Sequence, residues 1–513
     1  MSTPNKYPWF TAGDLNAFFG LMLDNVTNLV VLTGILSGVF GFPVEFIFTH
    51  MIPGTALGVL VGDLIYTWLA FRLAKRTGRT DITAMPLGLD TPSTIGIAFA
   101  VLGPVYIATK DPMVAWQVGM ATMIFMGIIK LVFSFAGDWI RKMVPQAGLL
   151  GSLAGIGVAL LGVLPLMKLF EMPLVGMVAF GLVLYTLVAK LKLPFKIPGA
   201  AAAVIGGTIL YYLLGELGLL SQAYHLPELS FSFTPPLPTL GFVDGLSRAI
   251  DFLPVAIPFG LLTIIGGINV TESARMAGDN YNTRDILLTE AIATLVAGVT
   301  GGVAQSTPYI GHPAYKAMGG RAGYTLACGL FIGIGGAFGF ISSLVSVLPE
   351  AAVVPILIFI GIEIVSQTFE VCPTNHYPAV ALSFLPVIAY LVLIQWKTLI
   401  GSDPSVLPDH QALQYPVVAA LGNGFILTAM LWGAFSAHLI DRNFLKSAIF
   451  LGICAVLSLV GMIHSIVPDG KLYLPWLMNN DLPWRIGTGY AAFALLLLLL
   501  TRFKKNNRGT AGG

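Results

Sequence analysis

Charged residues are scarce in this chain of 513 residues. Asp, Glu, Lys and Arg make up 10% of the sequence and the mean hydropathy is +0.84, whereas a soluble domain carries about 25% charged residues. The net charge is only +2, which gives no basic or acidic surplus for binding nucleic acid or acidic partners. Many apolar runs approach the roughly 20 residues that cross a bilayer. These features exclude an ordinary soluble domain and indicate an integral membrane protein.

Cysteines and several functional motifs are also missing or rare. The three cysteines, Cys328, Cys372 and Cys454, are isolated from one another, which favours a packing role over metal or redox chemistry. The first residues lack the basic and apolar regions of a signal peptide, so none is expected. The sequence contains neither HExxH nor GxxxxGK[ST], and we therefore expect no enzyme, no cofactor and no bound metal.

Sixteen segments are apolar enough to be membrane spans. The third and tenth, near 84–107 and 306–318, are irregular and too short for plain helices. If both termini are cytoplasmic, the predicted inner loops hold 20 of the 27 Lys and Arg residues, and the outer loops and their edges hold six. This distribution follows the positive-inside rule. We expect a multi-pass protein of a bacterial inner membrane with both termini in the cytoplasm.

The longest loop divides the predicted spans evenly. Residues 221–247 are polar and proline-rich, and they separate seven spans from the next seven. A seven-span unit reverses its orientation when it is duplicated, which is the layout of an inverted-repeat transporter. The predicted fold class is therefore an all-α polytopic membrane protein with a 7+7 inverted repeat, half-helices in spans 3 and 10, and 14–16 transmembrane helices.

The two irregular spans occupy the same position in the two halves. The third begins "TAMPLGLDTPSTIG" (83–96) and the tenth begins "STPYIGHPAYKAMGG" (306–320), and both are interrupted by proline and glycine. Non-helical backbone at membrane depth requires a protein or water-filled surrounding. Paired interruptions of this kind predict a transporter's substrate site between two half-helices. Two unrelated proline kinks are the alternative interpretation.

Ionisable residues within the spans are functional candidates because they are costly in a bilayer. Asp90 and His312 lie in the two interrupted segments. Glu272 is the first candidate for proton coupling, with Asp90 the second, although Glu272 could instead lie at the cytoplasmic interface and pair with Arg275. Capping or pairing with Arg284 is as plausible as a functional role for Glu290. The role of Asp24 is left open, and a structural or interfacial role is favoured for Asp63, Glu363 and His438.

Three stretches resemble the nucleobase–cation symporters of the second type, which include the xanthine and uracil permeases. The stretches are "LLTEAIATLVAGVTGGVAQSTPYIGHPAYKAMGGRAGYTLACGLF" (287–331), "PLGLDTPS" (86–93) and "PILIFIGIEI" (355–364), and they are most similar to the purine permease branch. The resemblance implies a core domain that moves against a gate domain, with proton coupling. The implied division is a core of 1–143 and 248–348, a gate of 144–247 and 349–440, and a C-terminal part, 441–513, with two extra spans and a basic tail.

The chain departs from that family where substrate would bind. The family's substrate-binding glutamate in span 10 falls on Gly311 and the next residue on His312, while the family's asparagine in span 3 falls on Asp90. The acidic position of span 8 falls on Glu272. Either this chain binds a different heterocycle, with the hydrogen-bond acceptor moved from span 10 to span 3, or its substrate is not a nucleobase. The implied substrate-binding residues are Asp90, Thr91, Glu272, Tyr309, Gly311 and His312.

Two transport functions follow from these features. The first is proton-coupled symport of a nucleobase or a similar small polar solute by alternating access. The second is an anion carrier for sulfate, bicarbonate or a carboxylate on the same fold, which His312 and the half-helix N-termini would favour and the carboxylates would oppose. The expected partners are a small-molecule substrate, a proton or other cation, and the lipid bilayer, with no nucleic acid. For the two extra spans, the alternatives are a packing surface and the surface of a homodimer.

Overall fold

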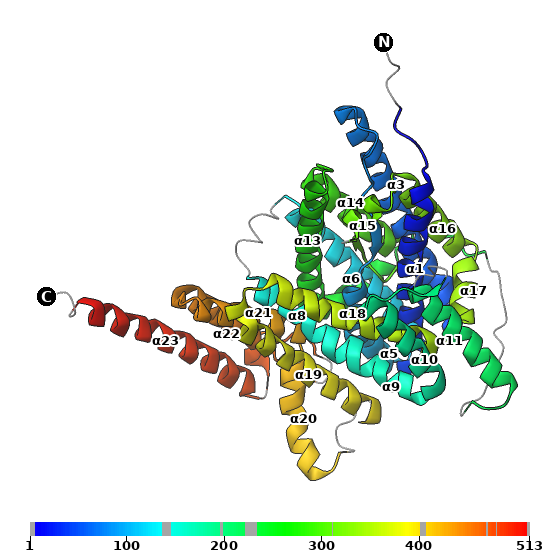
Figure 1. Ribbon diagram of the computed structural model, residues 1–513. Coiled ribbons are helices and arrows are strands. Elements are labelled where there is room, and N and C mark those ends of the chain that lie inside the picture. Colours follow the sequence, from blue (N-terminus) through cyan, green and yellow to red (C-terminus); the bar gives the residue numbers. More distant parts are fainter. Residues whose placement is uncertain are drawn as a thin grey trace. The chain divides into compact units, whose positions relative to one another are not determined.

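The computed structural model is almost entirely helical (Figure 1). It describes residues 6–135, 145–194, 199–220, 233–309, 311–400, 407–467, 470–478 and 480–509. The chain divides into two compact units. The first contains Met1–Ile140, Leu166–Ala249 and Phe259–Leu357, and the second contains Arg141–Pro165, Ile250–Pro258 and Ile358–Gly513.

The first unit holds both interrupted segments. Its first half comprises α1 (Ala12–Gly34), η1 (Ile35–Val39), α2 (Val44–Phe46), η2 (Ile47–Met51), α3 (Ile52–Thr77), β1 (Leu87–Leu89), α4 (Thr91–Ile97), η3 (Ala98–Leu102), α5 (Gly103–Thr109) and α6 (Pro112–Phe133). Its later elements are α10 (Pro173–Val183), η5 (Leu184–Val188), α11 (Gly199–Glu216), α12 (Gly241–Ala249), α14 (Thr283–Val299), β2 (Ser306–Pro308), α15 (His312–Ala317), α16 (Gly323–Ala337) and α17 (Phe340–Val347).

The second unit is built from the remaining helices. It contains α8 (Gln146–Val158), η4 (Ala159–Val163), η7 (Ile250–Phe252), η8 (Thr374–His376), α19 (Tyr377–Ile400), α20 (Asp409–Gly422), α21 (Phe425–Ile440), α22 (Phe444–Leu459), η10 (Pro475–Leu477) and α23 (Leu482–Gly509). Three helices run from one unit into the other, namely α9 (Leu164–Glu171), α13 (Leu253–Met276) and α18 (Glu350–Val371).

The prediction of a polytopic helical fold is confirmed. The described residues contain 10 helices that are long and apolar enough to cross a membrane, or up to 12 if each of two bent pairs forms one span. Two shorter apolar helices cover Pro173–Val188 and Phe444–Leu459. Each of the sixteen predicted segments contains a helix. The tenth contains only the six-residue α15, as its prolines and glycines indicated.

The two interrupted segments meet in a two-stranded antiparallel sheet. Leu87 pairs with Pro308, Gly88 with Thr307 and Leu89 with Ser306. The ladder is extended at one end by the bond from the Asp90 N–H to the Gln305 carbonyl, at 2.9 Å. Because the strands are antiparallel, α4 and α15 begin at opposite ends of the ladder. This is the arrangement expected of half-helices in two inverted repeats.

Glycine brings the surrounding helices close to this sheet. A Cβ on Gly329 of α16 would lie 2.8 Å from the Cβ of Asp63 in α3, and a Cβ on Gly333 would lie 2.6 Å from the Leu60 side chain. Only glycine allows such close packing of two helices. Helices α1, α3 and α14 contact the ladder, and α16 packs against α1 and α3 (Figure 1).

The contact-based units differ from the predicted core and gate. Residues 166–249, which the resemblance implies are part of the gate, group with the first unit. A division by compactness does not report which parts move during transport, so the core and gate division stays a prediction.

Candidate functional site

Asp90 begins the first half-helix and is held there by capping. It is the N-cap of α4, and its Oδ2 accepts a hydrogen bond from the Ser93 N–H at 3.0 Å. Pro92 in the first turn fits the helix start because it has no N–H to satisfy. The Gln305 side chain lies 3.5 Å from the same carboxylate oxygen. The carboxylate therefore compensates the positive end of its own half-helix.

A buried ion pair lies beside this helix start. Lys130 of α6 and Glu290 of α14 are 2.8 Å apart, and each side chain is 1% exposed. The Lys130 ammonium also donates to Thr294 Oγ1 and to the Ser306 carbonyl, both at 3.1 Å. Lys130 thus connects α6 and α14 to the first residue of β2.

Several buried polar atoms at this end of the ladder have no hydrogen-bond partner among the described residues. We call the ladder-end cluster the residues Asn28, Thr94, Gln305 and Ser306, together with Glu290, whose carboxylate pairs with Lys130. The amide of Asn28 reaches the Leu89 carbonyl at 3.4 Å, opposite Ser306 in the ladder. An unpaired buried polar atom is costly, and native proteins satisfy almost all of them. So many such atoms in one place indicate a polar ligand or water.

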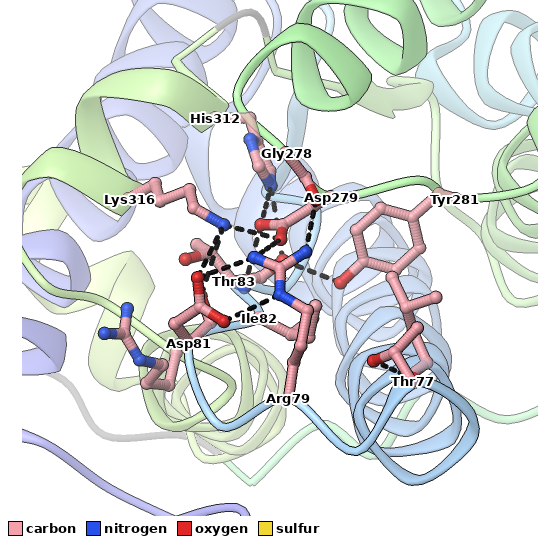
Figure 2. Close-up of polar contacts among 12 residues, drawn as sticks. Thr77, Arg79, Asp81, Ile82, Thr83, Gly278, Asp279, Tyr281, His312 and Lys316 are labelled. Carbon is pink, nitrogen blue, oxygen red and sulfur yellow. Dashed lines mark hydrogen bonds and ion pairs between the residues drawn. The ribbon is translucent and has the colours of Figure 1, made fainter.

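His312 lies at the other end of the ladder in a second polar cluster, shown in Figure 2. Asp279, in the turn between α13 and α14, is fully buried there. Its Oδ1 is 2.5 Å from Lys316 Nζ, its Oδ2 is 3.4 Å from His312 Nε2, and Oδ2 accepts from the Thr83 N–H at 3.0 Å. Arg79 and Asp81 complete what we call the Asp279 cluster.

The proton on His312 can be placed from its contacts. Nε2 faces two acceptors, the Thr83 carbonyl at 3.2 Å and Asp279 Oδ2, so Nε2 carries the proton and donates. Nδ1 is buried and has no hydrogen-bond partner among the described residues. His312 therefore anchors the start of α15 to the segment that leads into β1.

The charges of the Asp279 cluster shift two carboxyl pKa values downward. Hydrogen bonds from Arg79 hold the pKa of Asp81 at about 2. Burial alone would raise the pKa of Asp279, but hydrogen bonds from His312, Lys316 and the Thr83 N–H outweigh it and keep that pKa below its usual value. Both carboxylates are therefore ionised at neutral pH.

The predicted site residues fall into separate groups. Asp90 and Thr91, which is 9% exposed, lie at the ladder-end cluster, whereas Gly311 and His312 lie at the start of α15. Tyr309 is 37% exposed, and its N–H bonds to the Pro86 carbonyl.

Gly311 has a structural reason to be glycine. A Cβ at this position would lie 2.7 Å from the Tyr309 ring and 3.0 Å from the Tyr315 ring. A glutamate therefore fits at this position only if these rings move. The two tyrosines fill the space next to the residue that the resemblance equates with a substrate-binding glutamate.

Glu272 belongs to neither the ladder-end cluster nor the Asp279 cluster. Its carboxylate pairs with Arg275 at 2.6 Å, and its side chain is 40% exposed. This is the interfacial pairing that the sequence left open as the alternative. Its role in substrate binding or proton coupling stays a prediction.

Sequence reasoning passed over three residues of these clusters. Lys130 falls inside a span and could have been found from its charge alone. Gln305 directly precedes the second interrupted segment, but its amide carries no distinctive signal. Asp279 lies in a polar turn that looked like an ordinary loop. Among the described residues, no group of three or more His, Cys, Asp or Glu side chains could hold a metal ion.

Comparison with known proteins agrees with this fold. The transmembrane domain of a cyanobacterium bicarbonate transporter, BicA, matches with a TM-score of 0.53 and 18% identity, over 76% of this chain and 97% of that chain. SLC26A9 matches with a TM-score of 0.54 and 11% identity, over 84% of this chain but only 65% of that chain. No protein-family model and no curated protein matches the sequence. The chain thus has the all-α polytopic fold of transporter transmembrane domains.

Proposed function

We propose that this protein is a secondary transporter that carries a small polar solute across the membrane together with protons, by alternating access. The observation that carries the proposal is the ladder-end cluster, a set of buried polar groups at the start of a half-helix, several of which have no hydrogen-bond partner among the described residues. Such atoms can bind a solute that both donates and accepts hydrogen bonds. The fold, shared with two proteins of which one is described as a bicarbonate transporter, supports transport rather than catalysis.

The charges favour a neutral solute. The site has two positive features, the N-terminus of α4 and the Lys130 ammonium, and each already faces a carboxylate, Asp90 and Glu290 respectively. An anion would add a third negative charge to a dry region, unless a proton neutralised one carboxylate first. A nucleobase or similar heterocycle presents N–H groups that can donate hydrogen bonds to the Asp90 carboxylate. This agrees with the resemblance to nucleobase symporters.

An anion carrier is the second candidate. It is favoured by Lys130, a buried cation beside the half-helix start, and by the fold shared with a bicarbonate transporter. Under this alternative a proton would neutralise Asp90 or Glu290. The positive group that faces it, the N-terminus of α4 or the Lys130 ammonium, could then bind the anion. The two candidates therefore differ in the ligand and share the site.

A ligand screen tests the proposal and separates the candidates. Purified protein is heated with purines, pyrimidines, bicarbonate or sulfate, and positive hits are then measured for uptake into proteoliposomes. We expect a nucleobase-like heterocycle to raise the melting temperature of the wild type, and Asp90→Ala to abolish that shift. Asp90→Ala also removes a helix cap worth about 1 kcal/mol. Asp90→Asn keeps a good cap and removes only the charge, so it should lose the shift as well.

Two outcomes would contradict this assignment. A normal ligand-induced shift in both Asp90 variants would remove Asp90 from the binding site. Stabilisation by bicarbonate or sulfate alone, followed by uptake of that ion, would favour the anion carrier.

The variant Glu272→Gln tests the coupling role predicted for Glu272. Because this carboxylate is partly exposed and pairs with a neighbour on its own helix, its removal should change stability by less than about 1 kcal/mol. We expect pH-driven uptake and solute exchange both to persist in proteoliposomes. Loss of pH-driven uptake with exchange retained would instead assign the coupling role to Glu272.

A further inference from the structure

Asp63 is a buried carboxyl group that the site described above does not use. It lies in the middle of α3 and is fully buried. Neither carboxylate oxygen has a hydrogen-bond partner, and no ion pair among the described residues includes Asp63. The backbone of Leu87 and the thiol of Cys328 interact with the group without completing a hydrogen bond of good geometry.

Among the described residues, the ionisable groups that act on Asp63 are acids. Cys328 and Tyr324 face it from α16, Tyr315 from α15 and Tyr66 from its own helix. Two further carboxylates act on these same neighbours, Asp24 of α1 on Cys328 and Tyr315, and Glu290 of α14 on Tyr66. No Lys, Arg or His among the described residues approaches Asp63 within ion-pair distance.

An ionised carboxylate cannot persist in this surrounding. Transfer of an isolated carboxylate from water into a low-dielectric interior is so unfavourable that such a group usually takes up a proton instead. A Cβ on Gly329 would lie 2.8 Å from the Cβ of Asp63, so α3 and α16 are in close contact at this level. The burial of Asp63 and its unpaired oxygens therefore favour the neutral carboxylic acid over the carboxylate.

The position of Asp63 connects this proton to the solute site. Leu87, whose backbone contacts Asp63, is the first residue of β1, and β1 runs directly into Asp90 and α4. Asn25 of α1 bridges the two regions, because it bonds to the Leu89 N–H at 2.9 Å and to Cys328 Sγ at 3.7 Å. Movement of β1 would change the surroundings of both Asp63 and Asp90.

We propose that Asp63 is a proton-binding site behind β1, filled in this conformation and emptied when β1 and α4 move during transport. The proposal rests on the proposed transport function, since it names the group that carries a coupling proton. The step is a simple transfer in which the Asp63 O–H gives its proton to water and leaves a carboxylate. That carboxylate forms only where water or a cation reaches it.

Infrared spectroscopy of the purified protein in nanodiscs tests the proton directly and needs no substrate. The wild type at neutral pH should show the C=O stretch of protonated carboxylic acids, and Asp63→Asn should lose one component of it in a wild-type-minus-variant difference spectrum. The asparagine has nearly the shape of the protonated acid, so the variant should fold. Glu363→Gln is the matched control. Glu363 is also predicted within a span but is exposed and accepts a hydrogen bond from Gln367 at 3.1 Å, so its removal should leave the band unchanged.

Uptake into proteoliposomes tests the coupling role. Asp63→Asn should lose accumulation driven by a pH gradient and keep exchange of internal for external solute. A C=O band of unchanged intensity in Asp63→Asn, or pH-driven accumulation that persists in that variant, would overturn the proposal. If the wild type transports no solute, the proposed function fails, while a band component lost in Asp63→Asn and kept in Glu363→Gln would still establish the bound proton.

Discussion

Replacing Lys130 with methionine is expected to abolish transport and to destabilise the protein by about 3–5 kcal/mol. The substitution leaves Glu290 buried with no countercharge, because the two side chains are each 1% exposed and pair at 2.8 Å. It also removes the donor to the Ser306 carbonyl, which holds the first residue of β2 beside α6. The loss should appear as a lower melting temperature of the purified protein and as no uptake into proteoliposomes.

A second variant separates folding from function. Lys130→Met combined with Glu290→Gln removes both charges, so most of the lost stability should return while transport stays absent. Lys168→Met is the matched control, since Lys168 pairs with Glu171 at 3.1 Å in a partly exposed position and should matter by no more than about 1 kcal/mol. If Lys130→Met and Lys168→Met have the same melting temperature, the buried pair does not stabilise the fold as inferred.

The interrupted spans could be predicted because their signal is local. Proline, glycine and polar residues within a few positions of one another mark 83–96 and 306–320 as non-helical starts. The pairing of Leu87 with Pro308 could not be predicted, because its register depends on residues more than 200 positions apart. That pairing determines which polar side chains share a site, and so the sequence named Asp90 and His312 without showing that they lie at opposite ends of one ladder.

The partners of the buried charged residues could not be predicted from the local sequence either. Glu290 was equally consistent with a pairing to Arg284, six residues away, but the Arg284 guanidinium lies 4.1 Å from the centre of the Phe135 ring and Glu290 pairs with Lys130. Asp279 lies in a turn whose composition is that of an exposed loop, yet it is fully buried because α15 and the segment before β1 pack over it. Burial of a loop residue arises from tertiary contacts, which periodicity does not report.

Replacing Asp279 with asparagine should strongly weaken the fold around the second half-helix. The substitution leaves three cationic or protonatable side chains, Arg79, His312 and Lys316, without the carboxylate that they share. Breaking a buried pair in this way costs about 3–5 kcal/mol. The loss should be measurable as a lower melting temperature and as faster proteolysis at the start of α15, which these contacts attach to Thr83.

The matched control is Asp81→Asn, which removes the other carboxylate of the cluster from a position that is 51% exposed and should change stability by less than about 1 kcal/mol.

The dependence of stability on acid tests the ionised state of Asp279. Because the pKa of Asp279 is held below its ordinary value in the folded state, its contribution is present above about pH 4 and is lost as the pH falls through the folded value. Asp279→Asn should therefore be less stable than the wild type at neutral pH and lose less stability on acidification. A variant whose melting temperature falls in parallel with the wild type from neutral pH to pH 3 would contradict this account of the Asp279 cluster.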